Sequence, residues 1–267
     1  MSECPLCNDI GVSVRTAGLV CVADVCQCRL PCPACDGTGF VYDTDEYGYR
    51  QAIECSCQRY ERRAKIFVDA QIPGRYSDAE FGRIKTDSGV DDMVNARRAA
   101  WRFAREYHPG VQGILLYGSV GTGKTYLACA VLRYLILNRG VRARFVEFMH
   151  LLSDLRATFG DRGHADQVMQ PLVDIPLLVI DELGKGRGSD WELSVLDELI
   201  SKRYNAKRTT LFTTNYGIEG PGRGGEALES ESLVERVGVR IHSRLMEMCQ
   251  PVRLVGRDQR RGNSFSP

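Results

Sequence analysis

The chain has 267 residues, of which 43% are hydrophobic and 26% charged, and its formal net charge is +1. This length allows one full-sized core and a small second module, and the low net charge excludes a global basic field for nucleic acid. The N-terminus has no apolar segment of the signal-peptide type, and no run approaches about 18 apolar residues. We therefore expect a soluble, cytoplasmic protein that makes no membrane contact.

Nine of the 11 cysteines lie in the first 57 residues. Without a secretion signal, this clustering favours metal thiolates over disulfides. The cysteines form an internal repeat, in which a CxxC pair is followed after 18 or 19 residues by a CxC pair. Each unit offers the four thiolates of one tetrahedral structural Zn²⁺ site. The predicted ligands of the two zinc sites are Cys4, Cys7, Cys26 and Cys28 in the first unit and Cys32, Cys35, Cys55 and Cys57 in the second.

Two other interpretations of the cysteines stay open. A redox CxxC motif or an iron–sulfur cluster is disfavoured, because the βαβ context of a thioredoxin-like motif is missing. The spacing also permits pairing across the repeats, for example of Cys4 and Cys7 with Cys55 and Cys57. On this basis residues 1–60 are predicted to form a tandem zinc-binding domain of zinc-ribbon type.

Residues 61–89 are predicted to link this domain to the rest of the chain. A helix is expected to continue from the last cysteines to near Ala70, and Pro73-Gly74 is expected to end it. Its basic residues are interpreted as a solvated helix face, with a nucleic-acid contact as the alternative. A further helix over 91–107 begins the larger predicted domain, residues 90–267.

The strongest motif of the chain is a GxxxxGKT pattern at 118–125. A predicted buried strand, 113–117, precedes it and a helical pattern, 126–137, follows, which is the context of a phosphate-binding loop. Glycines let backbone N–H groups surround phosphate oxygens, the lysine adds positive charge near the β- and γ-phosphates, and the threonine offers a hydroxyl to Mg²⁺. An ordinary glycine turn is the alternative. The predicted ATP-binding residues are Gly118, Ser119, Val120, Gly121, Thr122, Gly123, Lys124 and Thr125.

An apolar run, 176–180, ends in Asp181 and Glu182. Such a run is typical of a buried parallel strand that delivers carboxylates at its C-terminal edge. Asp181 is predicted to complete the Mg²⁺ shell with Thr125, and Glu182 to orient and deprotonate the attacking water. An acidic cap of the following helix is the alternative.

A predicted strand over 209–214 follows a helix over 191–205 and ends at Asn215. The amide of Asn215 is predicted to bind the γ-phosphate or the lytic water, and a turn former is the alternative. One helix is expected from Leu233 to Met248, because apolar residues repeat there at helical spacing. Arginines 236, 240 and 244 repeat beside this stripe, either as a solvated edge or facing a neighbouring subunit's phosphates or a nucleic acid. A final strand is expected over 252–255.

Taken together, residues 113–256 resemble the AAA+ ATPase core of bacterial replicative-helicase loaders of the DnaC/DnaI type and of the related IstB transposition helpers. The resemblance implies an α/β fold with a five-stranded parallel sheet and a strand inserted between the two phosphate-site motifs. No C-terminal lid is expected, because few residues follow the three arginines. The resemblance also implies an arginine finger for the adjacent protomer, which Arg244 matches best, with Arg240 as a second contact. The stretches that support it are 118–125, 178–184, 200–204, 213–216 and 240–245.

The cysteine-rich region is similar to the zinc-binding N-terminal domain by which some loaders grip the helicase, although tandem units differ from their single site. The resemblance implies a Mg²⁺-dependent ATPase that self-associates, binds single-stranded DNA, and loads or remodels a replicative helicase. The alternatives are an IstB-like transposition helper and a zinc-module adaptor with a structural nucleotide. Glu182 argues against the adaptor, because binding alone needs no acid to activate water.

Overall fold

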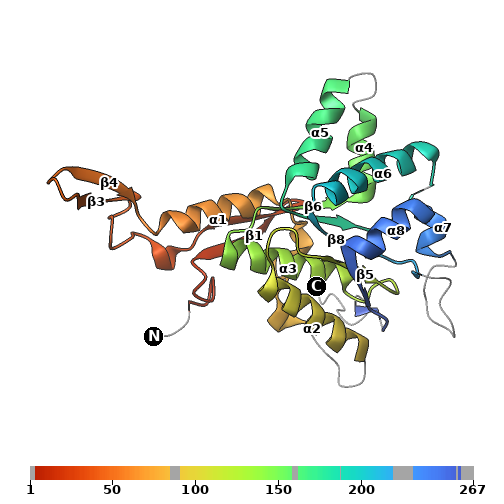
Figure 1. Cartoon of the computed structure of the whole chain (residues 1–267). Coiled ribbons are helices and arrows are strands. Elements are labelled where there is room, and N and C mark those ends of the chain that lie inside the picture. Colours follow the sequence, from red (N-terminus) through yellow and green to blue (C-terminus); the bar gives the residue numbers. More distant parts are fainter. Residues whose placement is uncertain are drawn as a thin grey trace. The chain divides into compact units, whose positions relative to one another are not determined.

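The computed structural model describes residues 4–84, 91–157, 162–186, 188–218, 231–256 and 258–259. The chain divides into two compact units (Figure 1). The first comprises Met1–Asp78 with Arg133–Val141, and the second comprises Ala79–Leu132 with Arg142–Pro267. Within the described ranges, no helix is long and apolar enough to cross a membrane. The domain limits at residues 60 and 89 remain predictions.

The first unit contains two antiparallel hairpins, one for each cysteine repeat. Strand β1 (Val12–Ala17) pairs with β2 (Val20–Val25), and β3 (Phe40–Thr44) pairs with β4 (Arg50–Glu54). Each hairpin lies between the CxxC and CxC pairs of its repeat, so its two ends bring those pairs together. A short 3₁₀ turn, η1 (Gln27–Arg29), follows β2.

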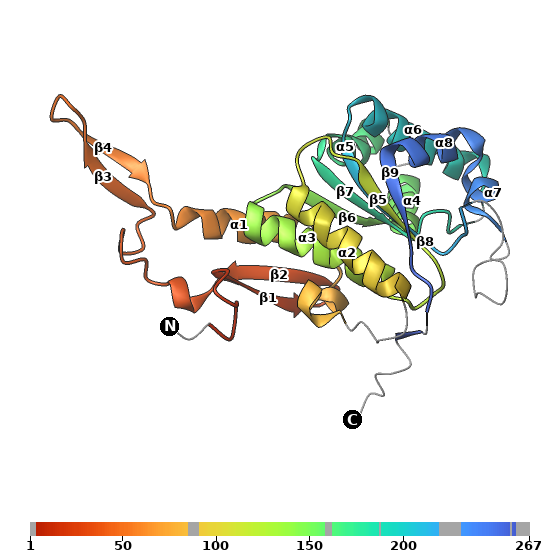
Figure 2. The same ribbon diagram turned by 60° about the horizontal axis from the view of Figure 1, so that its bottom comes forward.

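Helix α1 (Gln58–Asp69) packs against the first hairpin (Figure 2). It buries Tyr60, Ala64 and Phe67, and a Cβ added at Gly11 would meet the Tyr60 ring at 2.4 Å. The segment after the helix continues this packing, because the Gly74 N–H donates to the Leu19 carbonyl at 2.9 Å. Two further 3₁₀ turns follow in the chain, η2 (Gly74–Tyr76) and η3 (Phe81–Arg83).

The second unit is built on a five-stranded parallel sheet in the order β6-β7-β8-β5-β9. Strand β8 lies between β5 and β7, as the resemblance implied. Strands β5 and β7 are largely apolar runs, since both faces of a parallel sheet are covered, whereas β8 between them is rich in threonine and also fully buried. The strands are β5 (Gly113–Tyr117), β6 (Ala143–Glu147), β7 (Leu177–Asp181), β8 (Thr209–Thr214) and β9 (Cys249–Arg253).

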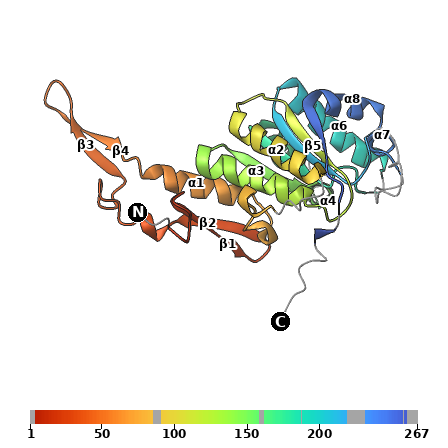
Figure 3. The same ribbon diagram turned by 90° about the horizontal axis from the view of Figure 1, so that it is seen from below.

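Helices cover both faces of this sheet. One face packs in a single apolar cluster against five helices: α4 (Phe148–Ala157), α5 (Arg162–Asp174), α6 (Asp190–Asn205), α7 (Leu233–Val237) and α8 (Val239–Met248). Figures 2 and 3 show α2 (Asp91–Glu106) and the first part of α3 (Lys124–Arg139) on the opposite face.

Three elements differ from expectation. The helix predicted from Leu233 to Met248 is two helices, because Gly238 adopts φ 80° and ψ 156° between them. Its apolar stripe is nevertheless buried from Leu233 to Leu245. The last strand begins at Cys249, three residues before the predicted start, and helix α5 was not anticipated.

Candidate functional site

The phosphate-binding motif forms the loop between β5 and α3. Its glycines at 118, 121 and 123 have φ values of 147°, 80° and 93°, which side chains with a Cβ rarely adopt. Lys124 is 6% exposed, and its Nζ donates to the carbonyls of Gly118 at 2.9 Å and Ser119 at 2.7 Å. The lysine charge is therefore held inside the loop.

Asp181 lies at the end of β7, directly beside the start of α3. Its carboxylate accepts hydrogen bonds from Thr125 Oγ1 at 2.9 Å and from Thr213 Oγ1. Burial raises the pKa of Asp181 to about 6, although these two hydroxyls favour the charged form. A hydroxyl and a carboxylate in contact are the oxygen ligands that Mg²⁺ takes, so Thr125 and Asp181 would hold the ion.

Glu182 leaves the strand in a different direction from Asp181. It adopts the left-handed conformation, with φ 56°, and its N–H donates to Thr213 Oγ1 at 3.0 Å. Its carboxylate accepts a hydrogen bond from Lys185 and is partly exposed. The Thr213 hydroxyl thus accepts a hydrogen bond from the Glu182 backbone and donates one to the Asp181 side chain. The two consecutive acids are separated into a buried carboxylate and an accessible one.

Asn215 follows β8, the strand between the two motifs. The Gly118 N–H donates to the Thr214 carbonyl at 3.3 Å, which places Asn215 beside the start of the phosphate loop. On the other side, the Thr214 hydroxyl donates to the Leu183 carbonyl at 2.8 Å. The structure therefore brings the predicted residues of β5, β7 and β8 to one edge of the sheet.

Arg244 takes part in a different set of contacts. Its Nη1 bonds Asp197 Oδ1 at 2.7 Å and Ser201 Oγ at 2.6 Å, both on α6. Arg240 lies 3.8 Å from the same carboxylate and is mostly exposed. These contacts tie α8 to α6, and the role of Arg244 toward a neighbouring protomer stays a prediction.

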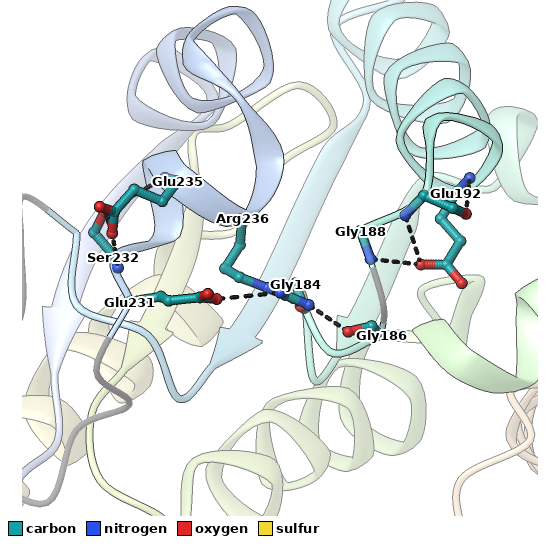
Figure 4. Close-up of polar contacts among 9 residues, drawn as sticks. Gly184, Gly186, Gly188, Glu192, Glu231, Ser232, Glu235 and Arg236 are labelled. Atoms are coloured by element: carbon teal, nitrogen blue, oxygen red, sulfur yellow. Dashed lines mark hydrogen bonds and ion pairs between the residues drawn. The ribbon is translucent and has the colours of Figure 1, made fainter.

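Arg236, one of the three regularly spaced arginines, makes contacts within its own chain that this spacing does not predict. From α7 it donates to the carbonyls of Gly184, at 3.1 Å, and Gly186, and its Nη1 lies 3.1 Å from a Glu231 carboxylate oxygen (Figure 4). Its guanidinium also stacks over the Tyr216 ring, 5.4 Å from the centroid. Arg236 therefore holds the loop that follows Glu182. Backbone carbonyl acceptors leave no pattern in a sequence.

Glu192 closes the far end of the same loop (Figure 4). It forms a capping box with Ser189 at the start of α6, accepts from the Gly188 N–H at 2.9 Å, and pairs with Arg156 at 2.7 Å. Burial raises the pKa of Glu192, but these donors outweigh it and leave the pKa below its ordinary value.

The segment after β9 contacts the phosphate loop. The Leu254 N–H donates to the Tyr117 carbonyl at 2.7 Å, and the Gln259 N–H donates to the Gly121 carbonyl at 3.0 Å. A Cβ at Gly118 would lie 1.8 Å from the Leu254 oxygen, and one at Gly121 would lie 2.0 Å from Asp258 Oδ1. These glycines thus make a packing contact in addition to their predicted role in phosphate binding.

The cysteines form two clusters, each within one repeat. In each cluster the four sulfurs lie within 4.8 Å of one another. The measured pairs are Cys4–Cys26 and Cys32–Cys55 at 3.8 Å, and Cys7–Cys28 and Cys35–Cys57 at 3.5 Å. A tetrahedral site with Zn–S bonds of about 2.3 Å has sulfurs about 3.8 Å apart. The clusters are therefore compatible with one zinc ion each.

Matching backbone contacts support the same interpretation. The Gly11 N–H donates to Cys7 Sγ at 3.4 Å, and the Gly39 N–H donates to Cys35 Sγ at 3.3 Å. Desolvation and the neighbouring thiols raise the pKa of Cys28, and likewise of Cys57, to about 12. Four thiols this close become thiolates together only when a cation offsets their repulsion.

Comparison with known proteins decides the family. Residues 59–261 match the model of the IstB-like ATP binding proteins. The chain belongs to this family. It is thus a P-loop protein of the AAA+ ATPase class, preceded by a small cysteine-rich region.

Two curated relatives of this IstB-like chain come from well-known bacteria. The replicative helicase loader DnaC of Escherichia coli K12 is 29% identical over 173 residues, which are 63% of this chain and 69% of the loader. The uncharacterised protein YqaM of Bacillus subtilis is 26% identical over 220 residues, covering 78% of this chain and 64% of YqaM.

Solved structures agree with this membership. A crystal structure of the DnaC helicase loader superposes with a TM-score of 0.59 at 28% identity and covers 67% of this chain and 98% of the loader. A crystal structure of DnaI gives a TM-score of 0.54 at 23% identity and covers 70% and 94% of the two chains. The latter likeness concerns the fold alone.

Proposed function

We propose that this protein is a Mg²⁺-dependent ATPase that loads or remodels a replicative DNA helicase on single-stranded DNA. The observation that supports catalysis best is the hydrogen-bonded group of Thr125, Asp181 and Thr213, with Glu182 beside it. The similarity to DnaC supports the helicase as partner.

In this proposal the phosphate loop and Lys124 bind the ATP phosphates. Thr125 and Asp181 would hold Mg²⁺, which would offset the charge that develops on the phosphates. Glu182 accepts a proton from the attacking water, and Asn215 orients that water or the γ-phosphate. Lys185 bonds Oε2 of the Glu182 carboxylate, so the other oxygen, Oε1, is the one assigned to accept the proton.

The remaining roles belong to assembly. Self-association through the ATPase domain would bring Arg244 of one protomer to the ATP of the next. The zinc-binding domain is assigned to the helicase contact, with both zinc ions structural. The match to the IstB-like model favours a transposition helper as the second candidate.

Two variants test the proposal. Lys124→Ala removes the phosphate charge, so we expect loss of ATP binding. Glu182→Gln removes the base, so we expect ATP binding to persist while turnover falls by about 10²–10⁴-fold. Binding is measured with a fluorescent ATP analogue and turnover by phosphate release.

Lys202→Ala is the matched control, since Lys202 pairs with Glu198 on the solvated side of α6. Wild-type turnover by Glu182→Gln would refute the assigned base. ATP binding without any turnover by the wild type would favour the adaptor. ATP-dependent loading of the helicase on single-stranded DNA, measured with the purified proteins, separates the loader from the transposition helper.

A further inference from the structure

The side chains of the β3–β4 hairpin are almost all exposed to solvent. Every residue of β4 is exposed, and in the described part of the chain this sheet has only its two strands. Among the residues that the structure describes, 11 large hydrophobic ones are exposed, and five of these fall within 40–54. Tyr42, Tyr47 and Tyr49 are 66%, 78% and 72% exposed. Clustered exposed apolar side chains mark an interaction site more often than scattered ones do.

These aromatic side chains are presented on an ordered element. Asp45 accepts from the N–H groups of Tyr47, at 3.0 Å, and Tyr49, at 2.8 Å, which fixes the turn. Arg50 stacks over the Tyr42 ring, 5.1 Å from its centroid. At the base, the Cys55 N–H donates to the Gly39 carbonyl at 2.8 Å. Tyrosines held in this way offer large contact area at low entropy cost.

The first hairpin shows that the exposure is not a general property of the repeat. Its strands pack against α1, and its charged side chains, Arg15 and Asp24, pair with each other at 3.3 Å. Of the large hydrophobic residues that are exposed in the described chain, only Leu19, at the turn, belongs to this hairpin. One copy of the repeat therefore builds the core of the unit, while the other leaves its hairpin uncovered.

The charge of the second hairpin selects among partners. Residues 40–54 contain Asp43, Asp45, Glu46 and Glu54 against the single base Arg50, a net charge of −3. Glu54, at the base of the hairpin, pairs with Arg62 of α1, so three acids and one base remain toward the turn, a net charge of −2. Exposed aromatics also stack on single-stranded bases, but sites of that kind combine them with positive charge. An acidic hairpin repels phosphates and attracts a basic protein surface.

We propose that the β3–β4 hairpin docks this protein onto a basic surface of its helicase partner, with Tyr47 and Tyr49 as the principal contacts. The identity of the partner rests on the function proposed above. The hairpin assignment itself rests on exposure, order and charge. Tyrosines that a partner covers on binding are enriched among the residues that dominate interface affinity. Acidic residues around them act mainly on the association rate.

The test measures binding of the full-length, zinc-loaded protein to the replicative helicase of the same organism. We expect the double variant Tyr47→Ser/Tyr49→Ser to weaken binding at least about tenfold. The double variant Asp43→Asn/Glu46→Gln should weaken it several-fold at low salt, with the difference shrinking at high salt. Leu19→Ser, on the turn of the first hairpin, is the matched control and should bind like the wild type.

Zinc content and ATP turnover are measured for each variant and should stay unchanged, since the altered side chains are exposed. Wild-type affinity in both hairpin variants would overturn the docking surface and leave the proposed function intact. Failure of the wild type to bind the helicase would overturn the partner itself. Binding to a thymidine oligonucleotide is followed in parallel. Loss of that binding in the tyrosine variant, with helicase binding intact, would make the hairpin a nucleic-acid surface and refute the proposal.

Discussion

Thr213 shows how much a single hydroxyl organises at the candidate site. It donates to the Asp181 carboxylate and accepts from the Glu182 N–H. The sequence predicted Asp181, Glu182 and Lys124 because phosphate chemistry demands those side chains. Thr213 was not predicted as a site residue, because a threonine in a β-strand is ordinary. Arg236 was noted for its spacing, but its bonds to the loop after Glu182 were not predicted, since the acceptors are backbone carbonyls.

A glycine substitution tests the contact between the phosphate loop and the segment after β9. In Gly118→Ala the new Cβ meets the Leu254 carbonyl, and the residue keeps a φ unsuited to alanine. We expect about 3 kcal/mol of destabilisation, measured by urea unfolding. Gly82→Ala is the control, because open space surrounds Gly82, and it should change stability by less than about 0.5 kcal/mol. Equal stabilities would contradict the packing role of Gly118.

Among the elements, the sheet was the most predictable part. Strand β5 has the predicted bounds, because a buried parallel strand appears in the sequence as an unbroken apolar run. The break at Gly238 was missed, since helical spacing of apolar residues continues across it. Helix α5 was also missed, and Pro171 lies inside it. The backbone conformation of individual residues decides where such helices begin and end, and the spacing of apolar residues does not reveal that conformation.

The cap of α6 predicts an acid-sensitive contribution to stability. The pKa of Glu192 is lower in the folded than in the unfolded chain, where it is about 4.5, so its contribution is present above that pH and lost as the pH falls through the folded value. At pH 7, Glu192→Gln should be less stable by about 2 kcal/mol, because it loses the charged bonds to Arg156 and the backbone.

Denaturant unfolding at pH 7 and pH 3 measures this difference, which should shrink at the lower pH. Glu198→Gln is the control on the same helix. Its pair with Lys202 is half exposed, and we expect less than about 0.5 kcal/mol at either pH. A Glu192 variant that differed from the wild type equally at both pH values would contradict the charged role of this residue.

At the scale of the whole molecule, the spacing of the cysteines predicted the repeat and one cluster within each unit, but it left pairing across the repeats open. Spacing alone permits clusters across the repeats. The structure groups the cysteines within each repeat, because each hairpin returns the chain to its own CxxC turn.

Metal removal tests these clusters. Elemental analysis should give two zinc atoms per chain. Strong chelation should unfold residues 1–57 and spare the parallel-sheet unit, because the two hairpins bury little apolar surface and structural zinc contributes on the order of 10 kcal/mol. Circular dichroism and limited proteolysis follow the unfolding. One zinc or none, or iron with visible absorbance, would contradict the tandem sites.

Mixing two inactive variants tests the arrangement of protomers. Arg244→Ala should keep ATP affinity and lose turnover by up to about 10³-fold if the side chain acts on a neighbour. Its mixture with Lys124→Ala can pair an intact phosphate loop with an intact arginine, so turnover should recover. Asp197→Asn breaks the intrachain pair but keeps the arginine, and it should stay active. No recovery on mixing, with assembly confirmed, would give Arg244 a structural role within its own chain.

The contact between the segment after β9 and the phosphate loop also links two equilibria. Leu254 and Gln259 each donate a backbone amide to residues that begin or form that loop. Thermodynamic reciprocity requires that if detaching this segment changes nucleotide affinity, nucleotide must change the detachment equilibrium by the same factor. The exchange of these two amide protons with deuterated solvent therefore offers an intrinsic reporter of site occupancy, which needs no label on the nucleotide and no turnover.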